Sequence, residues 1–479
     1  MAEVDLIIIG AGPAGMSAAA VAAQGGLRVL MLDEQPRPGG QIFRNVSQNR
    51  DQRGYLGKAY AAGAGLVDAL NHPRITFEAG ATVWRLDKGP QVTWSQGGVS
   101  RTTPAAHVLL ATGAQERPAP FLGWTLPGVM PAGAVQILMK TTEMLPKDAV
   151  LAGSGPLLYL IAAQMIDAGC PPQALVETQS SRDMLSALRH LPRALFGAPT
   201  LLKGLSLIAK IRAAGVPRYT AASDFRATAK TNGDVAFSFR AKGRDEFLTC
   251  GLLLTHQGVI PGTHITRAAG IAHEWNAAQG AFQPKHDLWG ATDQPGLHLA
   301  GDGAGIGGAE AAAAAGELAA LNILSQSGHL STDTRNQQAA RARAALFRAR
   351  AIRPFLDAAY PPPAEILTPS DDTIVCRCEE VSAGAIRQAI GEGEQGHRQI
   401  KTSLRCGMGP CQGRMCDATL RGLLNEGRAN RLISPPRARS PIKPIALGEL
   451  AALSPLRRNP HERPRSPESQ RPAQKLRLA

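Results

Sequence analysis

The N-terminal segment contains the pattern that most restricts how this chain can fold. An apolar strand over residues 4–9 leads into Gly10-Ala-Gly12-Pro-Ala-Gly15, an alanine-rich helix follows over 16–24, and a second strand ends in Asp33 and Glu34. In such a unit the three glycines permit a tight turn, the approach of a pyrophosphate and close helix–sheet packing. The helix N-terminus attracts phosphate, and an acid about 20 residues on accepts hydrogen bonds from a ribose. The segment predicts a doubly wound α/β domain that binds a dinucleotide; a glycine-rich turn without a ligand is the alternative.

The composition agrees with an α/β chain of several domains. A length of 479 residues predicts about three domains. Hydrophobic residues make up 44% of the chain and aromatic residues only 4%, while glycine is abundant. This mixture suits tight layers of helices on strands better than a β-sandwich.

A second strand–turn–helix unit begins at residue 149. It contains Gly153-Ser-Gly155, and the next strand, over residues 174–177, again ends in an acid, Glu177. The third glycine position holds Leu158, whose bulk would keep the helix away from the strand. We therefore expect the fold of a nucleotide-binding domain here. NAD(P) or an adenine nucleotide is an open possibility for its ligand, and a domain kept only for architecture is the alternative.

Three further stretches are rich in small residues at the ends of predicted strands. Gly39 and Gly40 would let a loop pass close under a flat ring system, although an ordinary connection between strand and helix would use glycines too. A strand over residues 108–111 runs into Thr112-Gly113. A strand over 296–300 delivers Gly301-Asp302, and a glycine-rich turn then opens an alanine-rich helix over 309–324.

Five of the seven cysteines lie between residues 376 and 416. Thiolates gathered in this way bind a soft metal centre or form disulfides, and nothing in the sequence indicates an oxidising compartment. The other two, Cys170 and Cys250, have no close partner in the sequence. A redox cysteine pair elsewhere in the chain is therefore not expected, and both are interpreted as buried structural residues.

The spacing within the cluster favours an iron–sulfur centre. Cys376 and Cys378 form a C-x-C pair, 32 residues intervene, and Cys411 and Cys416 form a C-x4-C pair, with Cys406 as a fifth candidate. Four thiolates suit a [2Fe–2S] cluster. Structural zinc prefers C-x2-C pairs; zinc is the competing metal, and unliganded thiols are the last alternative. The expected ligands are Cys376, Cys378, Cys411 and Cys416, with Cys406 as the alternative.

Charge and hydropathy limit the remaining classes of function. Half of the formal net charge of +14 lies in residues 434–479, which hold eight Arg and two Lys against three Glu and many prolines. No aromatic residues accompany these charges, so we expect a disordered extension or docking arm and no nucleic-acid partner. The N-terminus has no signal-peptide pattern and residues 149–166 contain glycines and a proline, so a cytoplasmic protein with at most peripheral membrane association is expected.

Residues 180–215 are basic and leucine-rich, with leucines at helical spacing. They predict helices with one apolar face. Such a face could cover a partner or the sheet, and we expect packing in the core.

These segments together resemble known families. The Gly301-Asp302 stretch resembles the two-dinucleotide-binding-domain flavoproteins, and the cysteine spacing resembles the bacterioferritin-associated-ferredoxin-like (BFD-like) [2Fe–2S] domain. Combined with the segment that begins Arg439-Ser-Pro-Ile-Lys-Pro, the chain is similar to the α (A or B) subunits of heteromeric amino-acid and imino-acid dehydrogenases. The corresponding subunits of opine oxidase, hydrogen cyanide synthase and D-hydroxyproline dehydrogenase are of this type, and the sarcosine oxidase α chain is a more distant relative.

The resemblance implies a fold, a domain order and a set of FAD contacts. The fold is α/β: a Rossmann-like flavoprotein with two dinucleotide-binding domains and a C-terminal BFD-like domain. The expected order is 1–120 FAD-binding domain, 121–285 second domain with a helical insertion, 286–360 return to the FAD domain, 370–433 [2Fe–2S] domain, and 434–479 basic tail. The residues implied in FAD binding are Gly10, Gly12, Ala14, Gly15, Asp33, Glu34, Gly40, Gln41, Thr112, Gly113, Gly301, Asp302, Gly308 and Ala309.

The resemblance also implies the activity and the partners. The family oxidises a C–N bond of an amino acid, imino acid or opine at a flavin on a separate, amino-acid-oxidase-like β subunit. A small ferredoxin-like subunit is an optional further partner. Electrons would leave through FAD and [2Fe–2S] to an external acceptor such as quinone or the respiratory chain. In agreement, the eleven histidines show no triad-like spacing, and no general base is nominated. A self-contained NAD(P)H-dependent FAD/[2Fe–2S] oxidoreductase and an assembly scaffold with vestigial sites are the alternatives.

Overall fold

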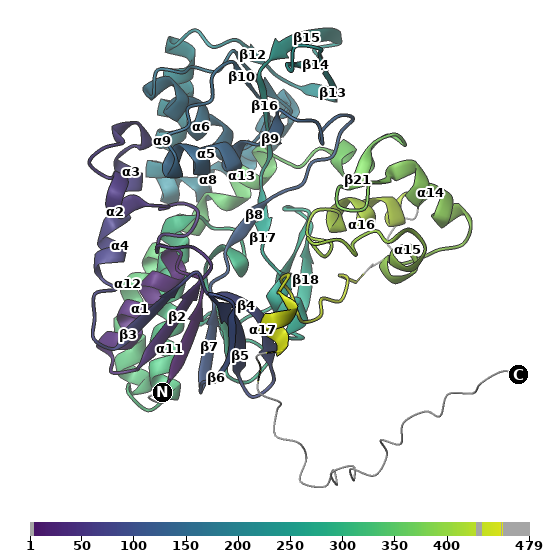
Figure 1. The fold of residues 1–479 in the computed structure, drawn as a ribbon. Helices are drawn as coiled ribbons and strands as arrows, with labels where there is room; N and C mark the ends of the chain where they lie inside the picture. Colours follow the sequence, from purple (N-terminus) through teal and green to yellow (C-terminus); the bar gives the residue numbers. More distant parts are fainter. Residues whose placement is uncertain (1–3, 428–433, 452, 454–479) are drawn as a thin grey trace, which may run out of the picture.

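Two five-stranded parallel sheets form the body of the molecule, and a smaller, mostly helical domain lies beside them (Figure 1). The computed structural model describes residues 4–427, 434–451 and 453. The arrangement confirms the α/β class expected from the sequence.

The first sheet has the strand order β20-β7-β1-β2-β3, which corresponds to Leu297–Leu299, His107–Leu110, Leu6–Ile9, Val29–Asp33 and Ile75–Ala79. Side chains of β1 alternate between the two faces. Leu6 and Ile8 pack with the alanines of α1 (Pro13–Gln24) and α11 (Ala309–Gln326). The two helices approach closely because Gly316 lies on the Ala14 carbonyl, where an added Cβ would come within 2.1 Å of the oxygen. The N-terminal unit therefore has the predicted order of strand, turn, helix and strand.

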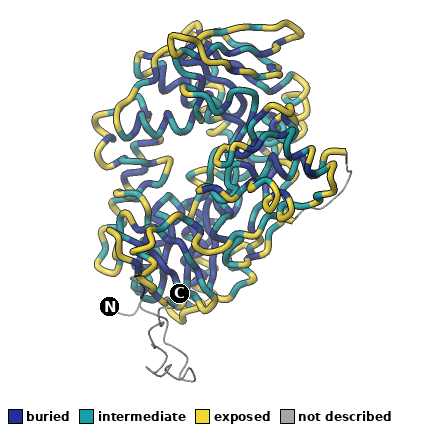
Figure 2. The backbone as a smooth tube through the Cα atoms, turned by 45° about the vertical axis from the view of Figure 1, so that its right-hand side comes forward, coloured by how far each residue is buried: buried dark blue, intermediate teal, exposed yellow. Residues whose placement is uncertain are grey.

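The opposite face of this sheet is covered by a three-stranded antiparallel sheet. Its strands are β4 (Thr82–Asp87), β5 (Gln91–Gln96) and β6 (Val99–Pro104). Ile7 and Ile9 pack here with Trp94 and with Ile265. Figure 2 shows the resulting buried centre of the domain and its exposed outer loops. Helix α12 (Thr332–Ala351) packs on α11.

The second sheet has the order β12-β11-β10-β16-β9, which corresponds to Arg218–Tyr219, Ala174–Glu177, Ala149–Ser154, Leu252–Gln257 and Val129–Pro131. Helices α5 (Ala132–Thr141) and α6 (Pro156–Asp167) belong to its core. A second hydrophobic cluster lies between this sheet and three antiparallel strands, β13 (Ala222–Ala229), β14 (Val235–Ala241) and β15 (Arg244–Cys250). Strands β8 (Ala114–Glu116) and β17 (Val259–Pro261) pair where the chain crosses between the two domains.

The cysteine-rich domain contains one small hairpin and three helices. These are β21 (Ile374–Cys376), β22 (Val381–Ser382), α14 (Ala383–Gly391), α15 (His397–Leu404) and α16 (Asp417–Asn425). Ser382 caps α14, because its side chain accepts a hydrogen bond from the Ala385 N–H at 3.2 Å. Apolar residues of these helices and Cys376, Cys406 and Cys416 share one core.

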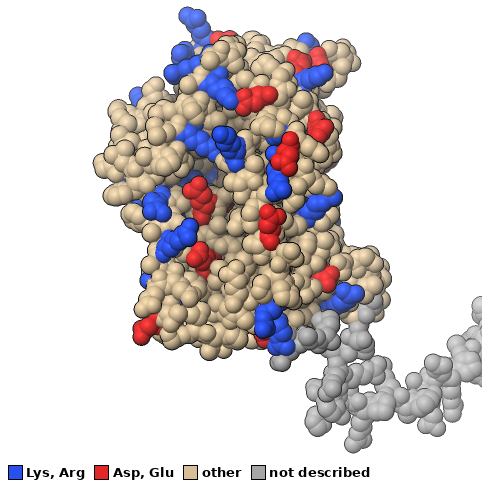
Figure 3. Space-filling view, turned by 90° about the vertical axis from the view of Figure 1, so that its left-hand side faces the viewer, with Lys and Arg blue, Asp and Glu red and all other residues tan. Residues whose placement is uncertain are grey.

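The leucine-rich region 180–215 corrects one sequence-based expectation. It forms α7 (Ser181–Ala187), α8 (Leu191–Ala194) and α9 (Ala198–Ala213), joined by short 3-10 turns. Much of its apolar face is exposed instead of buried: Leu185 is 69% exposed and Leu202 65%. Helix spacing predicts an apolar face but not what covers it. Figure 3 views the molecule from the side on which α9 lies in Figure 1.

The segment 434–451 corrects a second expectation, because it is ordered against the FAD-binding domain. The Ile442 N–H donates a hydrogen bond to the Trp84 carbonyl at 2.9 Å, and Ile442 is buried in the core of that domain. A short helix, α17 (Leu447–Ala451), follows. The prolines and arginines of residues 434–479 predict a disordered tail, and residues 454–479 of it lie outside the described residues.

Candidate cofactor sites

The first glycine turn has the shape that a pyrophosphate requires. Gly10 has φ +107°, and a Cβ there would come within 2.4 Å of the Ala111 carbonyl oxygen. A Cβ on Gly15 would meet the Gly10 oxygen at 1.9 Å, so no side chain fits at the third glycine. Gly12 is the N-cap of α1 and supplies no side-chain cap, which leaves the first N–H groups of the helix free for an anion.

The two acids after β2 have different surroundings. The Asp33 carboxylate accepts hydrogen bonds from the Ala11 N–H at 2.6 Å and the Gln35 N–H at 2.8 Å, so it fixes the glycine turn. Burial raises the pKa of Asp33, and the two backbone hydrogen bonds partly offset that rise. Glu34 lines the cavity and pairs with Lys443 at 2.8 Å. Of the two acids, Glu34 is the exposed one.

Asp302 shapes the second cofactor turn. Its Oδ1 accepts hydrogen bonds from the Gly307 and Gly308 N–H groups at 2.8 and 2.9 Å. Gly308 is the N-cap of the 18-residue helix α11, with φ +89° and no atom within 4 Å of an added Cβ. The helix N-terminus therefore opens toward the cavity, where its positive end would stabilise negative charge on a flavin ring.

The remaining predicted FAD residues meet around the same space. Gly303 packs on Thr112 and Gly113, since a Cβ there would lie 3.2 Å from the Gly113 oxygen. Gly40 touches Gly12, with 2.8 Å between an added Cβ and the Gly12 Cα. The structure brings all fourteen predicted residues except Gly15, which lies under the turn, to the lining of one cavity of about 2310 Å³. The glycine turns, the strand ends and the N-terminus of α11 that line this cavity are the features that a site for FAD requires.

The second glycine turn is different because its acid is buried among other side chains and lies outside the cavity lining. Glu177 is completely buried, and its carboxylate accepts two hydrogen bonds from Arg218 at 2.8 Å each. The Tyr159 hydroxyl and the Gln179 amide, at 2.5 and 2.6 Å, donate to the same carboxylate. Leu158 is buried in the domain core. No oxygen of Glu177 faces the cavity that Ser154 and Gly155 line.

A histidine–glutamate pair lies between the two domains and was missed in the sequence. His256 Nδ1 and Glu116 Oε1 are 2.6 Å apart, and the Gly133 N–H donates to the other Glu116 oxygen at 2.9 Å. The other ring nitrogen of His256 faces Gly155 of the second glycine turn. The two residues are 140 positions apart, so no local spacing could reveal them.

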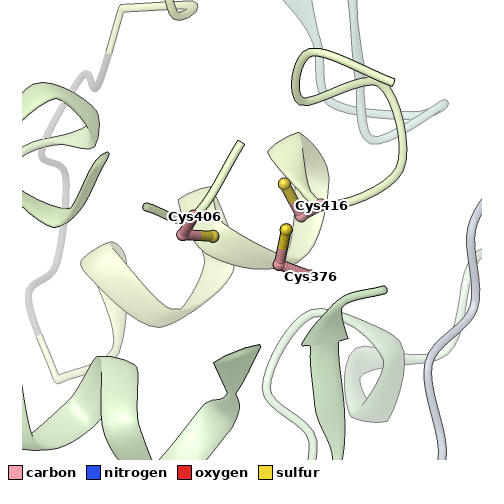
Figure 4. Close-up of side chains that lie close together, drawn as sticks. All are labelled: Cys376, Cys406 and Cys416. Carbon is pink, nitrogen blue, oxygen red and sulfur yellow. The ribbon is translucent and has the colours of Figure 1, made fainter. Parts of the chain in front are cut away.

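The cysteine cluster has a buried part and a rim. The Sγ atoms of Cys376, Cys406 and Cys416 all lie within 4.8 Å of one another, and all three residues are buried (Figure 4). Cys378 is exposed and Cys411 is half-buried. The structure thus brings Cys406, the alternative ligand, together with two of the four expected ligands. No disulfide involves any of the seven cysteines.

The electrostatics of the three buried thiols fit a bound metal centre. Hydrogen bonds from Cys406 and Cys416 lower the pKa of Cys376 to about 2, while the bond with Cys376 raises the pKa of Cys406 to about 12. Among the three, Cys376 is thus the sulfur on which negative charge is most favoured. Cations would allow the other thiols to ionise. The Gly407 N–H points at the Cys376 sulfur at 3.5 Å, and Gly409 lies on Cys378.

Several contacts fix the cysteine-rich domain against the flavin domains. The Gln115 side chain donates to the Arg414 carbonyl at 2.9 Å, and Arg267 pairs with Asp417 at 2.7 Å. Trp124 Nε1 donates to the Ile374 carbonyl at 2.7 Å. Cys406, Cys416 and the flavin turns line the same cavity, so both cofactor sites face one space.

The segment 434–443 forms a further wall of this cavity. Gln412 donates to the Pro441 carbonyl at 3.0 Å, and Arg414 donates to the Ile442 carbonyl at 3.0 Å. Lys443 then reaches Glu34. The segment therefore links the cysteine loop to Glu34, which lies far from both in the sequence.

Comparisons with known proteins agree with this arrangement of sites. The family description "Pyridine nucleotide-disulphide oxidoreductase" matches residues 4–319, and "BFD-like [2Fe-2S] binding domain" matches residues 374–426. The chain is 44% identical to the A subunit of opine oxidase from Agrobacterium tumefaciens over 94% of this chain and 92% of that protein. It is 32% identical to the HcnB subunit of hydrogen cyanide synthase from Pseudomonas aeruginosa over 92% of this chain and 96% of that protein.

A solved structure shows the same fold over most of the chain. The L-proline dehydrogenase from P. horikoshii matches with a TM-score of 0.69 and 21% identity, covering 94% of this chain and 79% of that one. The fold and the two sites define a flavoprotein oxidoreductase that also holds a [2Fe–2S] cluster. The chain belongs to the family of α (A or B) subunits of heteromeric FAD/[2Fe–2S] amino-acid and imino-acid dehydrogenases.

Proposed function

We propose that this chain is the electron-transfer subunit of a heteromeric dehydrogenase that oxidises the C–N bond of an opine, amino acid or imino acid. The observation that carries the proposal is the shared cavity: the flavin turns, Cys406 and Cys416 line one space. FAD accepts electrons in pairs and the iron–sulfur cluster passes them singly, which is the chemistry that the two groups supply when bound. The similarity to the A subunit of opine oxidase favours an opine as the substrate class.

Substrate oxidation is assigned to a flavin-containing, amino-acid-oxidase-like β subunit. Among the described residues, His256 and Glu116 pair at the second glycine turn, and His397 pairs with Asp417 inside the cysteine-rich domain. Both pairs line the same cavity as the flavin turns but belong to other elements, and neither is nominated as a base for substrate oxidation. An external acceptor such as quinone or the respiratory chain would take the electrons, and a small ferredoxin-like subunit is an optional part of the complex. All seven thiols are free, which supports a reducing, cytoplasmic compartment.

Anaerobic reduction of the purified chain tests this proposal. An opine or imino acid should bleach the flavin only when the β subunit is present, and NADH alone should leave it oxidised. The surroundings of Glu177 support the second expectation. Rapid bleaching by NADH without a partner would contradict the subunit role and favour the self-contained NAD(P)H oxidoreductase. A purified chain with neither flavin nor iron would favour a scaffold.

We propose that Cys376, Cys378, Cys411 and Cys416 hold the [2Fe–2S] cluster and that Cys406 is the spare thiol. Two buried sulfurs and two at the rim would supply two ligands to each iron, as a cluster held by four thiolates needs. Cys416→Ser should abolish the visible absorbance and the iron content of the anaerobically purified protein. Cys406→Ser should retain both. The reverse result would assign Cys406 as a ligand and Cys416 as the spare.

A further inference from the structure

The helical region α7–α9 carries a concentration of exposed apolar side chains. Seventeen large hydrophobic residues are exposed in the described chain, and eight of them lie between Ser181 and Ala213. They are Met184, Leu185, Leu188, Leu191, Leu195, Phe196, Leu202 and Leu205. Phe347 of α12 extends the patch, because its ring lies 5.6 Å from the Phe196 ring and is also exposed. Exposed apolar area of this extent marks an interaction surface.

The charges in this region are almost all positive. Residues 181–213 contain six Arg and Lys, one His and a single acid, Asp183. Lys210 pairs with Asp167 at 2.7 Å. Arg182, Arg189 and Arg193 are exposed among the leucines. Figure 3 shows Lys and Arg side chains spread over the upper part of this side of the molecule.

Length and sequence favour a helix that lies on a membrane over one that crosses it. By length and composition alone, Ser181–Ala213 would pass as a span, with a mean hydropathy of 1.4 and 17% of the window buried. However, the region is divided into three helices by 3-10 turns, with Pro192 and Pro199 at two helix starts. The 16 residues of α9 extend about 24 Å, short of the roughly 30 Å of a hydrocarbon core.

The types of residue in 181–213 favour a lipid-binding surface over a protein interface. Protein interfaces are enriched in Tyr, Trp, Phe, Met and Arg and depleted in Lys, and leucine, the commonest exposed residue here, is under-represented at their hot spots. Residues 181–213 contain neither Tyr nor Trp, and the exposed apolar side chains are leucines with one Phe and one Met. Leucine and phenylalanine beside Arg and Lys are typical of helices that bind at an anionic lipid interface.

We propose that α7–α9 is a membrane-binding surface that docks the protein on a bilayer containing anionic lipid. The leucines enter the boundary between headgroups and acyl chains, and Arg189, Arg193 and Arg212 contact lipid phosphates. The other side of α9 lines the cofactor cavity through Thr200, Gly204 and Leu207. If the proposed electron-transfer function holds, docking would place that cavity beside the membrane, where a lipid-soluble acceptor is dissolved; the docking itself does not depend on that function.

Vesicle flotation of the full-length protein with its cofactors tests the proposal. Vesicles of phosphatidylcholine with phosphatidylglycerol should carry the protein to the top of a density gradient, and pure phosphatidylcholine vesicles should not. Binding to the anionic vesicles should weaken as salt is raised. Protein that stays at the bottom with anionic vesicles at low salt would overturn the proposal.

Matched variants locate the surface. Leu195→Glu/Leu202→Glu/Leu205→Glu should abolish flotation, whereas Phe247→Glu, at a site on β15 that is 76% exposed, should retain it. Arg189→Gln/Arg193→Gln/Arg212→Gln should weaken binding by about fivefold for each arginine, and Lys230→Gln/Lys242→Gln/Arg244→Gln should change it little. Unchanged flotation of the leucine variant would overturn the proposal, and loss of β-subunit binding with flotation intact would show that the surface contacts a protein instead. Flavin absorbance checks that each variant is folded.

Discussion

The two glycine turns of this chain look alike in the sequence but differ in what they can bind. Each follows a buried strand, precedes a helix and is followed by a strand that ends in an acid. At the first turn, Glu34 lines the cavity. At the second, Glu177 is enclosed by Arg218, Tyr159 and Gln179. The comparison teaches that a nucleotide-binding fold can persist when its ribose acid has become part of the core.

The largest expected effect comes from giving the first turn the residue of the second. Gly15→Leu places a side chain where even a Cβ would lie 1.9 Å from the Gly10 oxygen. We expect complete loss of FAD, measured by absorbance of the purified protein. Leu158→Ala is the matched change at the second turn: it should cost about 2–5 kcal/mol of stability and leave the FAD content unchanged. Loss of flavin in Leu158→Ala would break the comparison.

Removing the enclosed acid should destabilise the second domain without affecting the first. Glu177→Gln leaves Arg218 without its ionic partner in a buried site, so the free energy of unfolding should fall by about 3–5 kcal/mol. Urea unfolding followed by circular dichroism measures this change. FAD affinity should stay as in the wild type. A stable Glu177→Gln variant that gained NADH-dependent flavin reduction would show that the acid is the barrier to a nucleotide.

The corresponding change at the first turn should act on cofactor affinity alone. Glu34→Gln keeps the size of the side chain but removes the charge that accepts ribose hydrogen bonds. Charged hydrogen bonds contribute about 1.5–3 kcal/mol, so the Kd for FAD should rise at least about tenfold, measured by fluorescence titration of the apoprotein. Asp33→Asn should instead loosen the turn itself, because Asp33 binds the Ala11 N–H. Equal FAD affinity in Glu34→Gln and the wild type would show that the Glu34 carboxylate does not contribute to FAD binding.

The smallest effect is expected at the pair between Lys443 and Glu34. The side chains of Lys443 and Glu34 are 31% and 40% exposed. Lys443→Ala should therefore lower the free energy of unfolding by less than about 1 kcal/mol. The rate of FAD release, measured in a stopped-flow dilution, should rise slightly, and the difference from the wild type should vanish at high salt. Lys285→Ala, at an exposed lysine outside the lining of the cavity, is the control. A salt-independent difference would indicate that Lys443 acts through packing.

Local patterns made much of this fold predictable. The glycine turn, the helix after Gly308 and the cysteine spacing are each set by neighbouring residues, and the structure has α1 and α11 where they were expected. The ligand capacity of the second turn was not predictable, because it depends on Arg218, 41 residues beyond Glu177. The pairs of His256 with Glu116 and Lys443 with Glu34 are likewise products of tertiary folding. Helical periodicity indicated the apolar face of α9 but could not indicate that it is exposed.

The segment 434–443 is the last part of the cofactor cavity along the chain. It forms a wall of the cofactor cavity and holds Glu34, yet the ribosome completes it after every other part of both cofactor sites. Until residues 434–443 are in place, that side of the cavity lacks one of its walls, and their closure over Glu34 would then hold FAD in. A tag fused at the C-terminus is consequently a probe of flavin retention and should be compared with an N-terminal tag before flavin content is interpreted.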